Sequence, residues 1–231
     1  MLKIIILAGG MATRLYPVTI KTPKSLIEIA GKPFIYYQLN YLKKQGIENI
    51  IICIGNLGEL IQNYVGNGSA WGLNIEYSHD GPNLIGTGGA IKKALPLVDE
   101  NFFVLYGDSY LPIGYKMVEQ AFLKSDKMGL MTVYKNNNEW DRSNVIYKNC
   151  VITEYNKINV NPEMNYIDYG LSVLNKRSFK IFNNIETFDV SELFGKLAEL
   201  GQLEGYEVYE IFHEVGSING ISNFNKYLKS K

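Results

Sequence analysis

LAGGMATRLYPVTIKTPKSL, residues 7–26, is the stretch that decides the fold and carries the strongest functional signal in this chain. It continues the apolar run KIIIL, residues 3–7, which is typical of a buried strand. A glycine pair follows, and glycines let the backbone approach a ligand closely and turn its N–H groups toward phosphate oxygens. Arg14 and Lys24 add two cations to the same loop. The stretch therefore predicts a strand followed by an anion-binding loop.

Charge balance excludes several classes of protein. The 231 residues include 23 basic and 23 acidic side chains, so the formal net charge is zero. General binding to nucleic acid or to a membrane surface usually needs a basic excess, and we expect neither partner. An anionic ligand must instead be held by a local cluster of cations. The neutral total makes the loop at residues 7–26 the first place to look for one.

Cysteine usage and hydropathy predict where the protein resides. Cys53 and Cys150 form neither a disulfide framework nor a metal-binding spacing, which indicates a reducing, cytoplasmic compartment. The apolar N-terminus lacks the charged start and the cleavage site of a signal peptide. No apolar stretch approaches the roughly 20 residues needed to cross a bilayer. We therefore expect a soluble protein.

The first part of the chain, up to about residue 135, alternates strand-like runs with segments of helical period. This alternation is the signature of βαβ units and of a largely parallel sheet. Strands are expected at residues 3–7, 49–54, 73–78, 102–106 and 130–134. Helical faces are marked by Ile35, Leu39 and Leu42, by Leu57, Ile61 and Tyr64, and by Ile91, Ala94 and Leu95.

Beyond residue 135 the chain is first polar and turn-like. Strands are then expected at residues 144–147, 151–155 and 168–174, and helices at residues 191–200 and along the face of Ile218, Ile221, Phe224 and Leu228. No linker rich in Pro or Ser separates the two parts. We predict a single domain over residues 1–231, in which the second half is built onto the first and carries part of a substrate pocket.

The stretch at residues 7–26 resembles the N-terminal signature of the sugar-1-phosphate nucleotidylyltransferases, GGxGTRLxPxTxxxPKP. Ala12 replaces the third glycine of this pattern and Ser25 its final proline. The similarity continues through GNGSAWGLNIEYS, LIGTGGAIKKAL, LYGDSY, EYNK and HEVGS. The family includes glucose-1-phosphate thymidylyltransferase, mannose/heptose-1-phosphate guanylyltransferase and muramate-1-phosphate uridylyltransferase.

The resemblance implies a fold and a reaction. The fold is α/β, a three-layer Rossmann-like nucleotidyltransferase fold with a mainly parallel mixed sheet and a small sugar-binding lobe. Residues 1–135 would form the nucleotide-binding half, and residues 136–231 the sugar-phosphate-binding half. The substrates would be a nucleoside triphosphate and a sugar 1-phosphate, and the products pyrophosphate and a nucleotide sugar for polysaccharide or glycoconjugate synthesis. Neither the base nor the sugar is indicated.

The same resemblance assigns the site residues and a Mg²⁺ cofactor. Arg14 and Lys24 would be the catalytic cations. Asp108 would be one Mg²⁺ ligand, in agreement with its place after a predicted strand, and Glu214 would stand where relatives have a second aspartate. The nucleotide would contact Leu7, Ala8, Gly9, Gly10, Ala12, Thr13, Gly86, Thr87, Gly88 and Asp108. The sugar phosphate would contact Asn144, Glu154, Lys157, Asp168 and Gly170.

Several alternatives stay open at this stage. Thr87 can also be interpreted as the cap of a helix. His213 can be interpreted as a surface residue beside the site. A glycosyltransferase of related fold would normally show Asp-x-Asp after a central strand, whereas Asp108 precedes Ser109 and Tyr110. A regulatory protein that binds nucleotide sugars would bind without turnover. A homo-oligomer also stays open, because no heptad or exposed apolar stripe decides the question.

Overall fold

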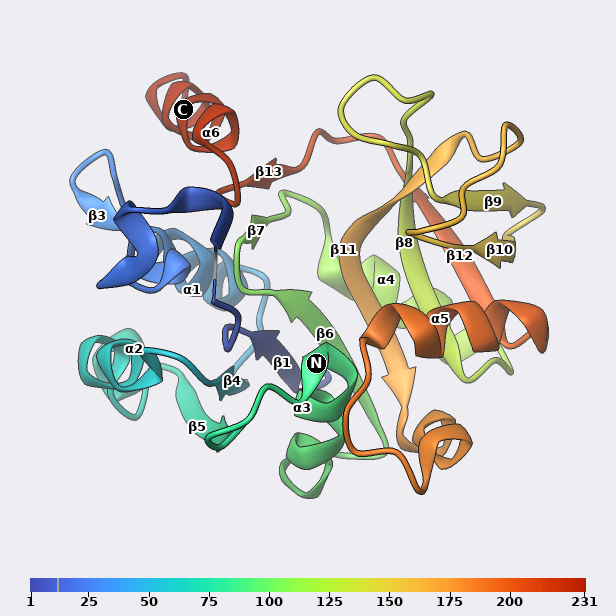
Figure 1. Ribbon diagram of the computed structural model, residues 1–231, viewed down its shortest axis with the longest axis horizontal. Helices are drawn as coiled ribbons and strands as arrows, with labels where there is room; N and C mark the ends of the chain where they lie inside the picture. Colours follow the sequence, from blue (N-terminus) through green and yellow to red (C-terminus); the bar gives the residue numbers. More distant parts are fainter. Residues whose placement is uncertain (12) are drawn as a thin grey trace.

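The computed structural model describes residues 1–11 and 13–231, with the backbone alone at Arg14. Nine strands of this described part form one sheet in the order β5-β4-β1-β6-β11-β8-β12-β10-β9 (Figure 1). They are β1 (Ile4–Leu7), β4 (Asn49–Ile54), β5 (Asn74–His79), β6 (Asn101–Tyr106), β8 (Gly129–Lys135), β9 (Val145–Lys148), β10 (Val151–Tyr155), β11 (Tyr166–Asn175) and β12 (Leu203–Val208). Strands from both halves of the chain therefore share one sheet.

The remaining elements lie around this sheet. Two short ladders pair β2 (Glu28–Ile29) with β3 (Lys32–Pro33) and β7 (Ser109–Tyr110) with β13 (His213–Glu214). The α-helices are α1 (Phe34–Lys44), α2 (Gly58–Val65), α3 (Gly86–Ala94), α4 (Tyr115–Lys124), α5 (Val190–Glu199) and α6 (Ile218–Lys229). Short 3₁₀ helices are η1 (Thr13–Leu15), η2 (Val18–Ile20), η3 (Lys24–Leu26), η4 (Ser69–Trp71), η5 (Leu95–Leu97) and η6 (Lys176–Phe182).

Strand direction changes across the sheet. β5, β4, β1 and β6 run parallel to one another. β11 then runs antiparallel to both β6 and β8, and β10 antiparallel to β12 and β9, whereas β12 is parallel to β8. The predicted α/β fold with a mixed sheet is confirmed. The strands from the first half pair mainly in parallel, whereas most neighbouring strands of the second half are antiparallel.

Helices cover both faces of the sheet and create three layers. Successive side chains of a strand point to opposite faces, so Ile4 and Ile6 pack in one apolar cluster and Ile5 in another. The first cluster includes core residues of α1, α2 and α4, and the second includes core residues of α3 and α5. Ile4, Ile5 and Ile6 expose none of their surface. Such burial on both faces explains why β1 is apolar at every position.

One strand of the main sheet and one α-helix were missed by the sequence patterns, as were the short ladders and the 3₁₀ helices. The strand β12 was not predicted, because its sequence LEGYEV contains two glutamates and a glycine, which are depleted in strands. It lies inside the sheet between β8 and β10, where neighbouring strands supply the pairing. The helix α4 was not predicted either, and its buried Val118 and Phe122 pack against the sheet. Within the described residues, no helix is long and apolar enough to span a membrane.

A third apolar cluster attaches α6 to the rest of the protein. Phe224 is fully buried in it, and its ring lies 5.4 Å from the Phe34 ring of α1 and 5.0 Å from the Tyr110 ring of β7. Val215, which follows β13, is buried in the same cluster. The cluster therefore holds the C-terminal helix and β13 against the first half of the chain.

We expect Phe224→Ala to lower the free energy of unfolding by about 3–5 kcal/mol, because a large buried ring is replaced by a cavity. Denaturant titration followed by circular dichroism measures the change. Ile218→Ala on the same helix is the matched control, since Ile218 is 79% exposed and its loss should cost no more than about 0.5 kcal/mol. Equal losses for the two variants would contradict this role of Phe224.

Candidate functional site

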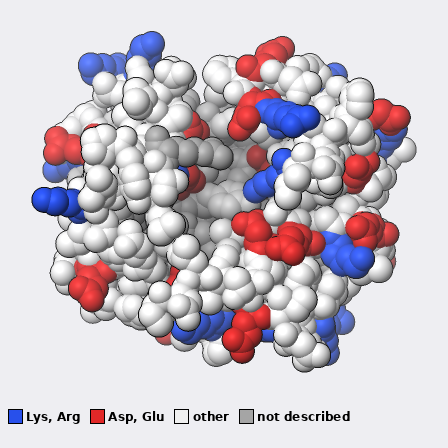
Figure 2. Space-filling model, in the orientation of Figure 1, with Lys and Arg blue, Asp and Glu red and all other residues white. Residues whose placement is uncertain are grey.

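A pocket of about 460 Å³ opens at the carboxyl ends of the parallel strands. This is the edge at which open α/β sheets place their ligands, and the volume suits a small molecule. Figure 2 shows the corresponding face of the molecule hollowed near its middle, with charged side chains on the rim. The lining residues are Leu7, Ala8, Gly9, Gly10, Met11, Thr13, Lys24, Ser25, Cys53, Asp80, Leu84, Ile85, Gly86, Thr87, Ala90, Tyr106, Gly107, Asp108 and Asp189.

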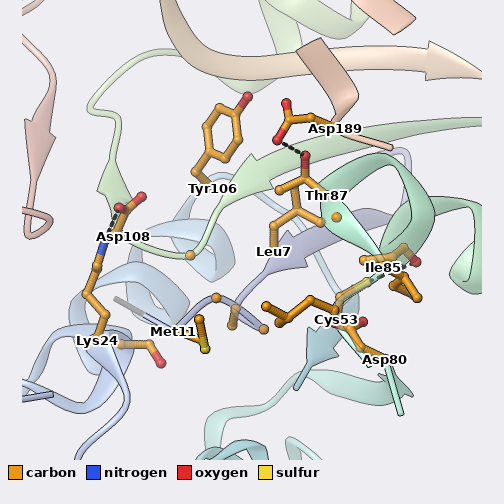
Figure 3. Close-up of a pocket in the computed structure, with 18 of the residues that line it drawn as sticks. Leu7, Met11, Lys24, Cys53, Asp80, Ile85, Thr87, Tyr106, Asp108 and Asp189 are labelled. Carbon is orange, nitrogen blue, oxygen red and sulfur yellow. Dashed lines mark hydrogen bonds and ion pairs between the residues drawn. The ribbon is translucent and has the colours of Figure 1, made fainter. Parts of the chain in front are cut away.

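A lysine and two carboxylates meet at one end of this pocket. Lys24 Nζ lies 2.9 Å from Asp108 Oδ2, as Figure 3 shows. A Cβ placed on Gly216 would lie 3.2 Å from each of these two atoms and 2.8 Å from Glu214 Oε2. A side chain at position 216 would collide with the Glu214 carboxylate, so the three charged groups pack closely around Gly216. The sequence predicted Lys24, Asp108 and Glu214 as members of one site, and the fold brings them together.

The two carboxylates are held together by backbone pairing. In the β7–β13 ladder Glu214 lies opposite Ser109, the residue after Asp108. The Val215 N–H also donates to the Asp108 carbonyl at 2.9 Å. These contacts join segments more than a hundred residues apart. Asp108 and Glu214 thus owe their proximity to a short antiparallel ladder rather than to neighbouring positions in the sequence.

The carboxylate pair has the chemistry of a divalent-cation site. Glu214 accepts hydrogen bonds from the Ser217 hydroxyl at 2.5 Å and from the Gly216 N–H, which hold its carboxylate beside the start of α6. Mg²⁺ in phosphate-transferring sites is commonly bound by one or two carboxylates together with substrate oxygens. In the described part of the chain, no group of three or more His, Cys, Asp or Glu could hold a metal by itself. The two carboxylates therefore fit Mg²⁺ only if a ligand completes its coordination.

Most of the predicted nucleotide-contacting residues line the pocket. They are Leu7, Ala8, Gly9, Gly10, Thr13, Gly86, Thr87 and Asp108. Gly88 does not, because it packs directly beneath the Phe188 ring. Ala12 and the Arg14 side chain lie outside the described residues.

The helix-capping interpretation of Thr87 is wrong. The N-cap of α3 is Ile85, and Thr87 lies inside the helix. Its hydroxyl donates to Asp189 Oδ2 at 2.9 Å and accepts from the Val190 N–H at 2.8 Å. Asp189 in turn caps α5, in a capping box with Glu192. Thr87 therefore joins α3, in the first half of the chain, to α5, in the second half.

A second polar cluster surrounds the Tyr106 side chain. Lys157 Nζ lies 3.3 Å from the Tyr106 hydroxyl and 5.2 Å from the centre of its ring. Asp168 accepts a hydrogen bond from Tyr155 at 3.2 Å and one from Tyr106. Because Tyr106 also lines the pocket, this cluster continues the pocket toward the second half of the chain.

The backbone of β11 fixes Asp168 in this cluster. The Asp168 N–H donates to Asn144 Oδ1 at 3.1 Å, and the Gly170 N–H donates to Asp168 Oδ1 at 3.0 Å. The β11–β8 pairing is irregular between Asp168 and Ser172, and Gly170 has a φ of +107°, a conformation that favours glycine. Three of the predicted sugar-phosphate residues thus meet through direct contacts.

Glu154 is the exception among the residues predicted for the sugar phosphate. Its Oε2 accepts a hydrogen bond from Asn161 Nδ2 at 2.8 Å, within the loop that follows β10. No described contact joins it to Asp168 or Lys157. The structure therefore places Lys157, Asp168, Asn144 and Gly170 together and Glu154 apart from them.

Burial shifts the protonation of this cluster. Desolvation raises the pKa of the Asp168 carboxyl, and the nearby Lys157 and the Gly170 N–H partly offset it. Desolvation, together with Asp168, also keeps the pKa of Tyr106 well above its usual value. Tyr106 is therefore a neutral hydroxyl at physiological pH, able to donate to Asp168.

His213, which precedes Glu214, and Trp71, in the 3₁₀ helix η4, both contact aromatic rings. The His213 ring lies 4.1 Å from the Tyr227 ring, and burial lowers the pKa of its imidazole. Trp71 donates from Nε1 to the Val65 carbonyl at 3.0 Å and contacts the rings of Tyr36 and Tyr64. Trp71 is therefore a packing residue.

Sequence patterns missed Tyr106, Asp189 and Asp80. Tyr106 directly precedes the recognised Gly-Asp pair and was counted only as a strand residue. Asp189 was hidden because its contact with Thr87 spans 102 positions. Asp80 directly follows β5, where a polar residue carries no signal of its own. A search for polar residues at the carboxyl ends of all parallel strands would have found Tyr106 and Asp80.

Comparison with known proteins identifies the family. Residues 3–146 match the family described as nucleotidyl transferase. The chain belongs to this family. The D-glycero-alpha-D-manno-heptose 1-phosphate guanylyltransferase of Aneurinibacillus thermoaerophilus is 33% identical over 192 residues, which cover 82% of this chain and 82% of that protein. The N-acetylmuramate alpha-1-phosphate uridylyltransferase of Neisseria meningitidis serogroup B is 41% identical over 121 residues, 52% of each chain.

A solved structure agrees with the nucleotidyltransferase fold. HddC from Yersinia pseudotuberculosis, complexed with GMP-PN, superposes with a TM-score of 0.83 at 23% identity and covers 99% of this chain and 100% of its own. At this identity the likeness concerns the fold. With the family match, the predicted membership in the sugar-1-phosphate nucleotidylyltransferases is confirmed, and the chain is a nucleotidyltransferase.

We expect Asp189→Ala to lower the free energy of unfolding of this nucleotidyltransferase by about 1 kcal/mol at pH 7, because the cap of α5 is lost. Burial alone would raise the pKa of Asp189, but hydrogen bonds from Ser191 and Thr87 outweigh it and lower the pKa. The contribution of the carboxylate is thus complete above the unfolded pKa of about 3.9 and is lost as pH falls through the lower folded pKa.

Urea titration of wild type and variant from pH 7 down to about pH 2 measures this difference. Glu192→Gln is the matched control, because glutamine completes a capping box as glutamate does. A gap between wild type and Asp189→Ala that widens on acidification would contradict the assignment.

Proposed function

We propose that this nucleotidyltransferase joins the phosphate of a sugar 1-phosphate to the α-phosphorus of a nucleoside triphosphate. A sugar-phosphate oxygen forms the new P–O bond, the bond between the α- and β-phosphates breaks, and pyrophosphate leaves with that electron pair. The observation that carries this proposal is the meeting of Lys24, Asp108 and Glu214 around Gly216, beside the end of the pocket that Lys24 and Asp108 line. Relatives that act on a heptose 1-phosphate and on a muramate 1-phosphate support the acceptor class.

The triphosphate would lie along the loop after β1. Gly9 and Gly10 line the pocket and let the backbone approach phosphate oxygens. Lys24 would stabilise charge on the α-phosphate, and its ion pair with Asp108 keeps the ammonium group at the reacting end. Arg14, from the same loop, is proposed to neutralise the departing pyrophosphate. Aligned cations of this kind lower the barrier because charge accumulates on the phosphates in the transition state.

Asp108 and Glu214 are the residues that would hold Mg²⁺. When bound, Mg²⁺ neutralises phosphate charge and holds the two reacting phosphates near each other. The protein contributes by keeping both carboxylates in place. The β7–β13 ladder and the Ser217 hydroxyl do this. Glutamate at position 214 suits this role here because its longer side chain is restrained by two hydrogen bonds.

The sugar 1-phosphate would occupy the cluster around Tyr106. Lys157 is proposed to attract its phosphate, and Asp168 with Asn144 to face the hydroxyl groups of the sugar. The neutral Tyr106 lies between this cluster and the nucleotide pocket. The acceptor needs no general base, because a phosphate monoester with a second pKa near about 6 is already largely ionised at pH 7. The protein contributes alignment and charge neutralisation.

We expect Lys24→Met and Asp108→Asn each to lower the rate of pyrophosphate release by about 10²–10³-fold with the fold retained, since each removes a preorganised charge from the reacting end. Arg14→Ala tests the third charged group in the same way. Coupled pyrophosphate detection measures the rates, and circular dichroism checks the fold. Lys21→Met is the matched control, because Lys21 is an exposed lysine of the same loop. Near wild-type turnover in Asp108→Asn would refute the assignment.

The reaction itself is tested by pairing the common nucleoside triphosphates with a panel of sugar 1-phosphates in the presence of Mg²⁺. We expect pyrophosphate release from at least one pair, and its loss on addition of EDTA. Mass spectrometry should detect the matching nucleotide sugar. Release of a nucleoside diphosphate from a nucleotide sugar would instead indicate a glycosyltransferase, and binding of both substrates without turnover would indicate a regulatory protein.

A further inference from the structure

Gln38 is a buried polar residue on an otherwise apolar face of α1. It follows Ile35 by about one helical turn and directly precedes Leu39, so the helical period places it among residues that pack in the core. Only 2% of Gln38 is exposed. Burial of an amide is costly unless the amide is hydrogen-bonded. The contacts of Gln38 therefore indicate why a polar residue occupies this position.

The Gln38 amide holds both ends of a short turn. Its Nε2 donates to the Tyr106 carbonyl at 3.1 Å and to the Ser109 carbonyl at 2.8 Å. Tyr106 ends β6 and Ser109 begins β7, so the turn between them consists of Gly107 and Asp108. Both partners are carbonyl oxygens, and only the NH₂ end of an amide can donate to them. One side chain thus uses both of its donors on the turn that carries Asp108.

The other end of the amide has no such partner. Gln38 Oε1 is buried and has no hydrogen-bond partner among the described residues. A buried acceptor that lacks a donor destabilises a fold, and an apolar side chain would avoid that penalty. The two hydrogen bonds to the turn are therefore what glutamine supplies here and what leucine or methionine would not.

The same contacts support both carboxylates of the reacting end. On the side of β1, the Gly107 N–H donates to the Leu7 carbonyl at 2.9 Å, and a Cβ on Gly107 would lie 2.6 Å from that oxygen. The turn is thus fixed between β1 and α1. Ser109 pairs with Glu214 in the β7–β13 ladder. Because the amide of Gln38 fixes the Ser109 carbonyl, α1 also supports the ladder that holds Glu214.

We propose that Gln38 is a positioning residue of this nucleotidyltransferase, whose amide fixes the turn that carries Asp108. The inference rests on the proposed function for the role of Asp108 and Glu214. Gln38 is not among the described residues that line the pocket, so it acts through the turn and not on a substrate. Displacement of a reacting group by about 1 Å can lower a rate about 10²-fold, so turnover should depend strongly on such a support.

Gln38→Met tests this role, because methionine has a similar length and no donor. We expect kcat for pyrophosphate release to fall about 10- to 100-fold. The KM for the sugar 1-phosphate should stay within about threefold of wild type, since Lys157 and Asp168 lie on other segments. Circular dichroism checks the fold. Gln120→Met, at an exposed glutamine of α4, is the matched control and should keep the wild-type kcat.

Thermal melting supplies a readout that is independent of turnover. The melting temperature of the full chain is recorded with ATP, GTP, UTP, CTP or dTTP, in MgCl₂ and again in EDTA. We expect Mg²⁺ to raise the melting temperature of the wild type with nucleotide. This increment should shrink in Gln38→Met and persist in Gln120→Met, because displaced carboxylates bind the ion less tightly. A purely structural role would lower the melting temperature of the free protein and leave the increment unchanged.

A wild-type kcat or an unchanged Mg²⁺ increment in Gln38→Met would overturn the assignment. If Gln38→Met does not fold, hydrogen exchange of the wild-type side-chain amides decides, measured by nuclear magnetic resonance. The Gln38 amide should exchange slowly because its donors are buried in hydrogen bonds, and exchange as fast as that of Gln120 overturns the assignment. Absence of pyrophosphate release from the wild type under every substrate pairing would remove the proposed reaction, and the Mg²⁺ increment would still test Gln38. Wild-type turnover that Gln38→Met retains would remove the role of Gln38 alone.

Discussion

The burial of β1 on both faces is the constraint on which the rest of the structure depends. Its three isoleucines expose no surface, and the strand pairs in parallel with β4 on one side and β6 on the other. Parallel pairing aligns the carboxyl ends of these strands, so the loops that follow them meet at one edge. The glycine pair, Gly107 and Asp108 reach the pocket for this reason. A core requirement thus positions the candidate site.

Closure of the site depends on a second set of contacts, which join the chain's end to its beginning. The β7–β13 ladder places Glu214 beside Asp108, and the aromatic cluster around Phe224 holds that ladder in place. On the opposite side, Thr87 and Asp189 connect α3 with α5. The pocket is therefore enclosed by both halves of one sheet, which explains how residues from distant segments can face one substrate pair.

Local pairing holds cations in place in a chain of zero net charge. Lys24 is paired with Asp108, and Lys157 lies over the Tyr106 ring near Asp168. The Lys24 side chain is 23% exposed, and its partial burial strengthens its field, whereas Lys157 is exposed.

Local patterns in the sequence determined the strands of the first half, the loop at residues 7–26 and the family, because each depends on residues close together in the chain. Lys24, Asp108 and Glu214 were predicted this way, through motifs that resemble those of the family. Only the tertiary structure decided that β12 is a strand, that Thr87 bonds to Asp189 rather than capping α3, that Glu154 lies apart from Asp168, and that Asp80 lines the pocket. These features depend on contacts between distant segments, and neither periodicity nor motif spacing records which distant groups pack together or which remain without a partner.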